Sequence, residues 1–520
     1  MKHFKKFFSY LVALTMVLSL AAFTGTKVNA QTGNYSIKLT NGGKTAHTFT
    51  IYQVFTGDVA NDGSLSNIKW GNGIKEEDKS TLGDAATKAE TLAKSETKDA
   101  DARAFAESLQ GHVNVTNGTT QTVAAGGEET VSLTEAGYYL IQDQIKNDGK
   151  SNQDGQKEGA TTLYMLKVVG RDTEANAKLD VPSVYKKVKD VNDSVANSTT
   201  EWQDSADYDI GDTIPYQLTG TLPSNYDKYD TYSYKFTDEM SAGLTYVNNS
   251  VKVYKKFGNT VSPIDSKEYT AKWKNQILTV EFSNLKNVTS NAADQIIVEY
   301  NATLNEHAVV GSKGNPNEVY LTYSNNPNAG GTGQTGYTPK DKNIVFTYKT
   351  VVNKVDQDEQ PLAGAGFTLQ KKVKKDDGTF GYQDVKKIEA GENTTSFTFE
   401  GLDDGDYQLI ESTTPAGYNT IAPIEFKIEA THDETADDPK LLTLTGNKAD
   451  GSTFLKTITE KKDNKDVPTG ELTASVKNQK GSTLPSTGGM GTTLLYVAGG
   501  ILVACAAAYV VMSRKHSTNK

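Results

Sequence analysis

Three polar residues in the central part of the chain stand where β-strands would bury them. Alternate side chains of a strand share one face, so a polar residue with apolar neighbours two positions away points toward the core. By this rule Lys186, Asp238 and Asn317 all face inward. The apolar residues that share their faces are Val184, Val188, Phe236, Val319 and Leu321. The pattern therefore predicts a buried amine, carboxyl and amide within one part of the chain.

A second set of the same kind follows, formed by Lys354, Glu411 and Asn478. Lys354 aligns less cleanly than the others, because Val351 and Val355 point to the opposite face. The apolar residues on the faces of this set are Phe346, Val352, Tyr407, Leu409, Leu472, Ala474 and Val476. The chain thus repeats one combination of side chains in two successive regions.

Each set could be an ordinary salt bridge beside an amide, since buried charges are costly unless they are paired. The same residues could also react with one another. Burial lowers the pKa of a lysine and raises the pKa of a carboxyl, which favours the neutral amine. That amine can attack the asparagine carbonyl while the carboxyl hydrogen-bonds to its oxygen and relays protons. Ammonia then leaves, and an amide bond joins the two side chains in a single turnover.

The two ends of the chain have the features of export and membrane retention. Residues 1–30 combine a basic start, a short apolar stretch and the small residues Val28, Asn29 and Ala30, which is typical of a cleaved signal peptide. Near the other end, residues 484–488 read LPSTG, residues 492–512 are apolar and long enough to cross a bilayer, and residues 513–520 are basic.

This arrangement resembles the cell-wall sorting signal of Gram-positive bacteria. The resemblance implies that a sortase reads Leu484, Pro485, Ser486, Thr487 and Gly488, cuts after Thr487, and passes its carboxyl to an amine. The apolar segment then holds only the precursor in the membrane.

Composition excludes several functional classes. Residues 31–487 carry 47 basic and 64 acidic residues, a net charge of −17 that argues against nucleic acid as a partner. The one cysteine, Cys505, lies in the apolar segment, so disulfides and a thiol nucleophile are not expected. The histidines of the exported part are far apart in sequence, and we predict no metal site, no cofactor and no multiple-turnover enzyme. Those histidines are His47, His112, His307 and His432.

Short alternating strands and frequent turn residues predict a mainly β protein with three tandem β-sandwich domains of immunoglobulin-like or Cna type. Changes in composition place them at residues 31–179, 180–340 and 341–480, here named the first, second and third blocks. Strands are expected at residues 47–56 and 131–143 of the first block. In the third block they are expected at 344–355, 365–370, 395–399, 407–411 and 472–478. A helical stretch is expected at residues 84–110, with one apolar face formed by Ala102, Phe105, Ala106 and Leu109.

Residues 407–418 read YQLIESTTPAGY and resemble the E-box of Gram-positive pilins. The third block around them is similar to a Cna B-type domain, whose opening matches residues 354–356 and 362–367. The second block resembles the middle domain of backbone pilins, in which an aspartate has the assisting role. The resemblance implies Lys186–Asn317 and Lys354–Asn478 isopeptide bonds, assisted by Asp238 and Glu411. In the first block Lys38 could have such a role, but no partner asparagine is evident.

The family resemblance implies a structural shaft subunit of a cell-wall-anchored surface pilus that supports adhesion. Its expected partners are pilus-type and housekeeping sortases, copies of itself, ancillary pilins, peptidoglycan and host matrix or glycans. Pilins usually present the acceptor lysine in a YPKN-like motif between the first two domains, which this chain lacks. Lys178, in the corresponding sequence NAKLDVP, is the candidate acceptor, with an ordinary solvated lysine as the alternative. The alternative function is a monomeric wall-anchored adhesin for host matrix or glycan.

Overall fold

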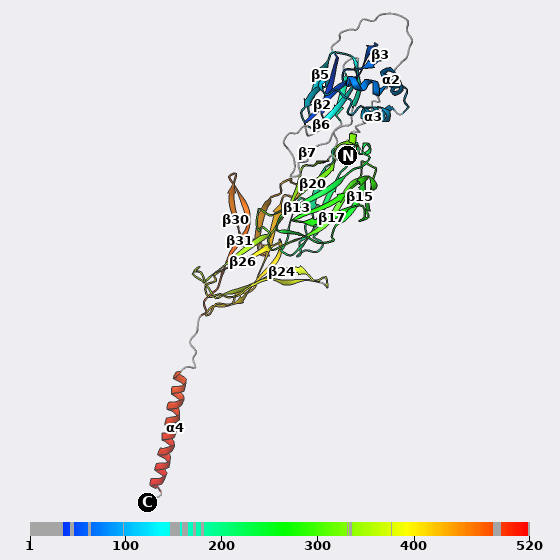
Figure 1. Ribbon diagram of the computed structural model, residues 1–520. Coiled ribbons are helices and arrows are strands. Elements are labelled where there is room, and N and C mark those ends of the chain that lie inside the picture. Colours follow the sequence, from blue (N-terminus) through cyan, green and yellow to red (C-terminus); the bar gives the residue numbers. More distant parts are fainter. Residues whose placement is uncertain are drawn as a thin grey trace, which may run out of the picture.

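The computed structural model describes residues 35–41, 46–60, 64–96, 98–145, 157–158, 165–169, 173–177, 181–329, 331, 335–375, 377–481 and 490–517. Its strands gather in three β-rich bodies that follow one another in a row (Figure 1), from blue and cyan through green to yellow and orange. The signal peptide, the sortase motif and Lys178 lie outside the described residues.

The first block contains two packed sheets. One has the strand order β5-β1-β9, and the other has the order β3-β2-β6-β8 with β4 beside β2. The expected strand 131–143 is two strands, β5 and β6, which belong to different sheets. The break between them, residues 134–136, is only three residues long, and a break this short does not reveal from the sequence that the chain changes sheet. The strands are β1 (Tyr35–Asn41), β2 (His47–Val59), β3 (Leu65–Trp70), β4 (Thr119–Val123), β5 (Glu128–Leu133), β6 (Gly137–Ile145), β7 (Lys157–Glu158), β8 (Met165–Val169) and β9 (Thr173–Ala177).

The helical part of the first block is also divided. Ser95 has an extended backbone, with φ −59° and ψ 136°, and ends a helix that Asp84 caps at its start through the Thr87 amide. Phe105, Ala106 and Leu109 are buried as expected, whereas Ala102 is only half-buried. The helices are η1 (Glu76–Asp78), α1 (Lys79–Leu82), α2 (Ala85–Lys94), α3 (Lys98–Ser108) and η2 (Val115–Asn117).

The second block, which in the structure also includes residues 341–346 that the sequence assigned to the third block, is a sandwich of two larger sheets. The first sheet has the order β10-β12-β19-β15-β16 with β14 on β19, and the second has the order β11-β22-β20-β13-β18-β17 with β21 and β7 at one side. The elements are β10 (Val184–Val188), β11 (Ser205–Asp207), β12 (Thr213–Gly220), η3 (Tyr226–Lys228), β13 (Tyr234–Met240), β14 (Leu244–Tyr246), β15 (Lys252–Phe257), β16 (Thr260–Pro263), β17 (Thr270–Lys274), β18 (Ile277–Phe282), η4 (Leu285–Asn287), β19 (Gln295–Leu304), β20 (Asn315–Ser324), η5 (Pro327–Ala329), β21 (Thr335–Tyr337) and β22 (Asp341–Phe346).

The third block folds nine strands around its own core, in the order β25-β24-β27-β28-β29-β30-β31-β23-β26. Its first strand, β23, runs parallel to its last strand, β31, with Lys354 opposite Val476. The strands are β23 (Tyr348–Val355), β24 (Gly366–Lys374), β25 (Phe380–Ile388), β26 (Ser396–Leu402), β27 (Gly405–Thr413), β28 (Ile424–His432), β29 (Leu441–Asn447), β30 (Thr453–Lys462) and β31 (Lys465–Lys477).

The expected strand 344–355 is two strands, because the chain passes from the second block to the third at Thr347. Strand β22 is shared between the cores: Val345 packs in the second block, whereas Ile344 and Phe346 pack in the third. Opposite faces of one strand therefore complete two different cores. This makes the second and third blocks neighbours in space as well as in sequence.

Helix α4 (Met490–Ser517) contains the apolar segment at the end of the chain. Residues Leu494–Arg514 have a mean hydropathy of 2.3, and their apolar stretch is not buried against the rest of the protein. Its length and composition fit a membrane span, two residues later than the sequence estimate.

Candidate functional site

The three polar residues of the second block meet in the middle of its sandwich. Lys186 lies on β10 in one sheet, while Asp238 and Asn317 lie on the paired strands β13 and β20 of the other sheet. All three side chains have an exposed fraction of 0%. The site therefore spans the core from one sheet to the other, and the inward orientation of its three side chains agrees with the alternation of apolar residues.

Tyr300 of β19 connects the three groups. Its hydroxyl donates to the Asp238 carboxyl at 3.0 Å and accepts from Lys186 Nζ at 2.8 Å and from Asn317 Nδ2 at 2.9 Å. Lys186 Nζ also contacts the Asp238 carboxyl directly. The Asn317 carbonyl oxygen is buried and makes no hydrogen bond to the described residues, so it is open to a new donor.

Burial favours the neutral forms of both charged partners. Loss of solvent lowers the pKa of Lys186, and the nearby Asp238 carboxyl partly opposes that shift. Burial likewise raises the pKa of Asp238, against the opposing effect of Lys186. A proton moved from the amine to the carboxyl leaves a nucleophile and an acid side by side.

The sequence analysis missed the aromatic residues of this site. Tyr216 and Tyr300 stack at a centroid distance of 5.3 Å, and Lys186 Nζ lies 4.9 Å from the centroid of the Tyr216 ring. Tyr300 shares its face of β19 with Val298 and Ala302, so the alternation rule could have found it. Asn343 of β22 is fully buried directly opposite Asn317, and only the pairing of β20 with β22 reveals it.

The third block brings together its own three residues in a different way. Lys354 and Asn478 are fully buried and Glu411 is 5% exposed. Asn478 Nδ2 donates to Glu411 at 2.8 Å, and the Asn478 carbonyl oxygen has no partner among the described residues. Lys354 Nζ donates to the backbone carbonyls of Val355 and Val476, at 3.0 and 3.1 Å.

Electrostatics in this second site again favour a neutral amine. Burial lowers the pKa of Lys354, with the Glu411 carboxylate as the main opposing charge. The other oxygen of Glu411 accepts from the Ile421 amide at 3.1 Å and the Thr414 hydroxyl at 3.3 Å, which fixes the carboxyl beside Asn478. The carboxyl and the amide are therefore in direct contact, whereas the Lys354 amine is held by two backbone carbonyls.

Two other lysines show that the surroundings of a lysine, and not the residue type alone, decide whether its amine can act as a nucleophile. Lys371 is 2% exposed but lies among Asp193, Asp209 and Asp403, and these carboxylates raise its pKa against the effect of burial. Lys38 of the first block forms a partly exposed ion pair with Glu128 at 2.8 Å. Both lysines lack the neutral, buried setting that a nucleophilic amine requires.

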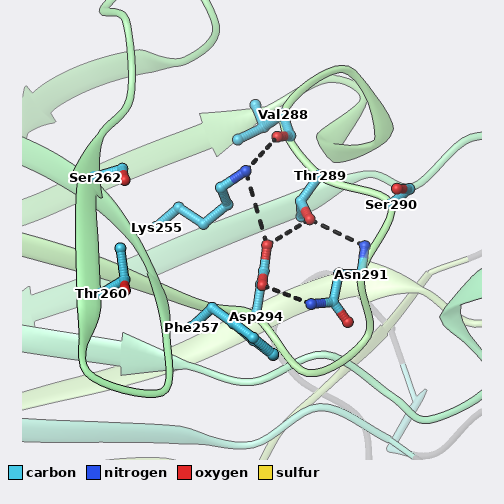
Figure 2. A pocket seen from close by; sticks show the side chains of 9 residues that line it. All are labelled: Lys255, Phe257, Thr260, Ser262, Val288, Thr289, Ser290, Asn291 and Asp294. Carbon is cyan, nitrogen blue, oxygen red and sulfur yellow. Dashed lines mark hydrogen bonds and ion pairs between the residues drawn. The ribbon is translucent and has the colours of Figure 1, made fainter.

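A surface pocket of about 460 Å³ beside β15 and β16 offers a different set of polar groups (Figure 2). Its central carboxylate, Asp294, accepts from the Thr289 hydroxyl at 2.6 Å and the Asn291 amide at 3.1 Å. Lys255 lies 3.8 Å from Asp294 and donates to the Val288 carbonyl at 3.2 Å. These polar groups form hydrogen bonds and an ion pair with one another. The pocket therefore has the features of a loop stabilised by internal contacts, and not those of a catalytic centre.

Two family models match the chain. Residues 210–327 match the Cna-B-like domain of subunit 2 of the Gram-positive pilin backbone, and residues 349–440 match a prealbumin-like fold domain. The first match contains Asp238 and the second contains Glu411, the carboxyl residues of the two buried sets.

Relatives and solved structures extend the likeness over most of the chain. The trypsin-resistant surface T6 protein of Streptococcus pyogenes serotype M6 is 27% identical over 400 residues, which cover 65% of this chain and 70% of the relative. The solved T6 backbone pilin of that organism has a TM-score of 0.51 at 19% identity, covering 86% of this chain and 98% of that structure. The full-length major pilin SpaD of Corynebacterium diphtheriae has a TM-score of 0.48 at 17% identity, with coverage of 86% and 98%. Together, the two matched domain models and the T6 relative show that this chain is similar to Gram-positive backbone pilins, and the solved T6 structure shows that it shares their fold.

Proposed function

We propose that this chain is the shaft subunit of a covalent pilus, strengthened by one intramolecular isopeptide bond in each of its second and third blocks. The observation that carries the proposal is the buried meeting of Lys186, Asp238 and Asn317 between two sheets. A bond there would fasten the first strand of the second block to a strand of the opposite sheet.

The reaction in the second block begins with a neutral Lys186 amine. Its Nζ attacks Asn317 Cγ while protonated Asp238 donates to the Asn317 carbonyl oxygen. The Nζ–Cγ bond forms, the Cγ–Nδ2 bond breaks, and one proton of the amine moves to Nδ2, which leaves as ammonia. Tyr300 touches both nitrogens and the carboxyl, so its hydroxyl can carry that proton.

In the third block Glu411 has the assisting role toward Lys354 and Asn478. Its existing hydrogen bond from Asn478 Nδ2 places the carboxyl next to the bond that must break. To reach Asn478 Cγ, the Lys354 amine must release the Val355 and Val476 carbonyls, because it now donates to both. The product would join β23 to the residue that follows β31.

Assembly requires a second, intermolecular amide. We propose that a pilus-type sortase cuts after Thr487 of the LPSTG sequence while α4 holds the precursor in the membrane. The Thr487 carboxyl then passes to Lys178 of the next copy, and a housekeeping sortase attaches the completed polymer to peptidoglycan. A head-to-tail contact of this kind does not close on itself, so it produces an open filament.

Intact-mass spectrometry tests the internal bonds. The full chain, after removal of its signal peptide, should weigh less than its sequence by two ammonia molecules. Asp238→Ala and Glu411→Ala should each restore one ammonia, whereas Asp294→Ala, a carboxylate outside both sites, should restore none. A wild-type mass equal to the sequence mass would falsify the proposed bonds.

The sorting step is tested separately, on a denaturing gel of cell-wall extract. Replacing Leu484 and Pro485 by alanine should leave the chain in the membrane or release it into the medium, with no high-mass ladder. A ladder in the wild type supports a shaft subunit, whereas a single wall-linked species would favour the monomeric adhesin. Normal wall attachment of the variant would contradict the sortase assignment.

A further inference from the structure

His432, at the end of β28, lies at the boundary between the third block and the second. Its Nδ1 is 2.7 Å from the Ser205 hydroxyl oxygen, and Ser205 donates its own hydrogen to the Asp433 carbonyl at 2.5 Å. Because the serine has one hydrogen, its oxygen can only accept from His432. The imidazole therefore carries a proton on Nδ1, which leaves the Nε2 lone pair free in the neutral ring.

The Nε2 atom points toward two carboxylates of the second block. It lies 3.6 Å from an oxygen of Asp190 and 3.7 Å from an oxygen of Asp207. These separations exceed the usual hydrogen-bond range. They are close to the roughly 3.3–3.5 Å between neighbouring ligand atoms around a tetrahedral ion with bonds of about 2.0–2.1 Å. The three ligand atoms lie within 4.8 Å of one another.

Further buried polar atoms around this group lack partners. The second oxygens of Asp190 and Asp207 make no hydrogen bond to the described residues. Tyr348 is fully buried and its hydroxyl faces the Asp207 carboxylate, so a further oxygen lies beside the group. Such groups are normally satisfied by protein, water or an ion.

The neighbouring lysine does not neutralise this group. Lys371 contacts Asp193, Asp209 and Asp403, but no ion pair joins it to Asp190 or Asp207 among the described residues. Asp207 is 2% exposed, and a buried carboxylate requires a positive partner, which without a metal can only be a protonated His432 among the described residues. A divalent cation would take the place of that proton and would be held by one nitrogen and two carboxylates.

We propose that His432, Asp190 and Asp207 form a binding site for one divalent transition-metal ion, with zinc as the preferred ion, and that the ion ties the second block to the third. Imidazole with carboxylates suits zinc and manganese, whereas calcium and magnesium prefer oxygen ligands alone. The hydrogen bond from His432 Nδ1 to Ser205 is the kind of support that orients metal-binding histidines. The sequence spacing of histidines did not indicate this site, because two of its ligands come from a different block.

Binding is tested on the full chain, purified in detergent without a histidine tag and stripped with EDTA. Zinc should bind with one ion per chain by native mass spectrometry and should raise the midpoint of thermal unfolding. Manganese should bind more weakly, and calcium should give no shift at the same concentration. Zinc X-ray absorption should show a shell of nitrogen and oxygen ligands without sulfur.

Two variants and a matched control locate the ion. His432→Gln and Asp190→Asn should each weaken zinc binding at least tenfold, with circular dichroism confirming that both remain folded. His112→Gln should bind zinc as the wild type does, since His112 has a single carboxylate, Asp78, at 3.0 Å. Absence of zinc binding by the wild type, unchanged affinity in both site variants, or loss of binding in His112→Gln would each overturn the proposal.

Discussion

At the scale of single residues, the buried lysines show how neighbours determine chemistry. Lys186 has one carboxyl partner and two tyrosine rings around its amine, and burial lowers its pKa. Lys371 has three carboxylates around its amine, and they raise its pKa. The first environment favours a nucleophile and the second favours a permanent cation, although both side chains are almost completely removed from water.

We predict that Tyr300→Phe slows formation of the second-block bond without abolishing it. The variant keeps the ring but removes the hydroxyl that contacts the amine, the carboxyl and the leaving nitrogen. One positioned proton-transfer group contributes on the order of 10²-fold or more to a rate. The ammonia loss should be followed by mass spectrometry after pulse labelling in cells.

Tyr216→Phe is the matched control for that experiment, because Tyr216 stacks on Tyr300 but its own hydroxyl has no hydrogen-bond partner among the described residues. It should mature at nearly the wild-type rate. Equal rates in all three proteins would show that the Tyr300 hydroxyl takes no part in the reaction.

We predict that Lys371→Met weakens the contact between the second and third blocks. The change leaves the carboxylates of Asp209 and Asp403 buried without their cation, which typically costs about 3–5 kcal/mol. Limited proteolysis should detect earlier cleavage around residues 341–347 than in the wild type. Lys372→Met is the control, since Lys372 forms a half-exposed pair with Asp406; equal cleavage of the two variants would contradict the prediction.

At the scale of elements, the second and third blocks are joined by a close approach of two glycines. Gly311 precedes β20 and Gly470 lies on β31, and the Ser312 amide donates to the Thr469 carbonyl at 2.9 Å. A Cβ atom on Gly470 would stand 2.3 Å from the Gly311 Cα atom. Only a residue without a side chain allows the backbones of these two elements to touch.

We predict that Gly470→Ala opens this contact and lowers the thermal midpoint more than Gly451→Ala does. Both glycines have a positive φ, +86° and +80°, so each alanine bears a backbone strain of about 1–3 kcal/mol. The Gly451 position has nothing within 4 Å of an added Cβ atom, whereas Gly470 faces backbone. Calorimetry of both variants separates the effect of the steric clash at Gly470 from the effect of the backbone strain that both variants share. Equal midpoints of thermal unfolding in the two variants would show that the contact between Gly311 and Gly470 contributes no stability.

At the scale of the whole molecule, the row of three blocks sets the path along which a pulling force would travel (Figure 1). The proposed bonds enclose 131 positions between Lys186 and Asn317 and 124 positions between Lys354 and Asn478. Where such a bond forms, a pulling force cannot stretch the segment between the two bonded residues. The first block has no corresponding buried set of lysine, carboxyl and asparagine that we recognise among its described residues.

We predict that Glu411→Ala makes the third block extensible. In single-molecule pulling, the variant should show an added extension of roughly 400 Å, from 124 residues at about 3.3–3.6 Å each. With handles at residues 181 and 481, so that the first block bears no load, the wild type should show no event of that length, because the proposed Lys354–Asn478 bond carries the load. Identical traces for the two proteins would rule out a closed third block.

In the proposed filament, the link between copies depends on Lys178, which lies outside the described residues. We predict that Lys178→Arg abolishes the high-mass ladder while its monomer still reaches the wall, because arginine keeps the charge but is not a usable nucleophile at neutral pH. Mass spectrometry of wild-type polymer should contain a Thr487–Lys178 crosslinked peptide. Lys187→Arg is the control, and a ladder that persists in Lys178→Arg would move the acceptor elsewhere.

The sequence alone determined the features that depend on local pattern. Apolar alternation identified the inward faces of Lys186, Asp238, Asn317, Lys354, Glu411 and Asn478, because a strand repeats every two residues and burial follows that repeat. The order of apolar segment and basic tail identified the membrane segment from composition. The same local patterns could not show where the chain changes sheet, and two expected strands, 131–143 and 344–355, proved to be divided.

Only the tertiary structure decided which distant residues meet. The Tyr300 hydroxyl bridges Lys186 and Asn317 because β19 and β20 belong to opposite sheets of one sandwich. Likewise, His432 faces Asp190 and Asp207 because β22 contributes to two cores and brings the third block against the second. These contacts join residues 17 to more than 200 positions apart, and their geometry follows from sheet packing, which no spacing along the chain records.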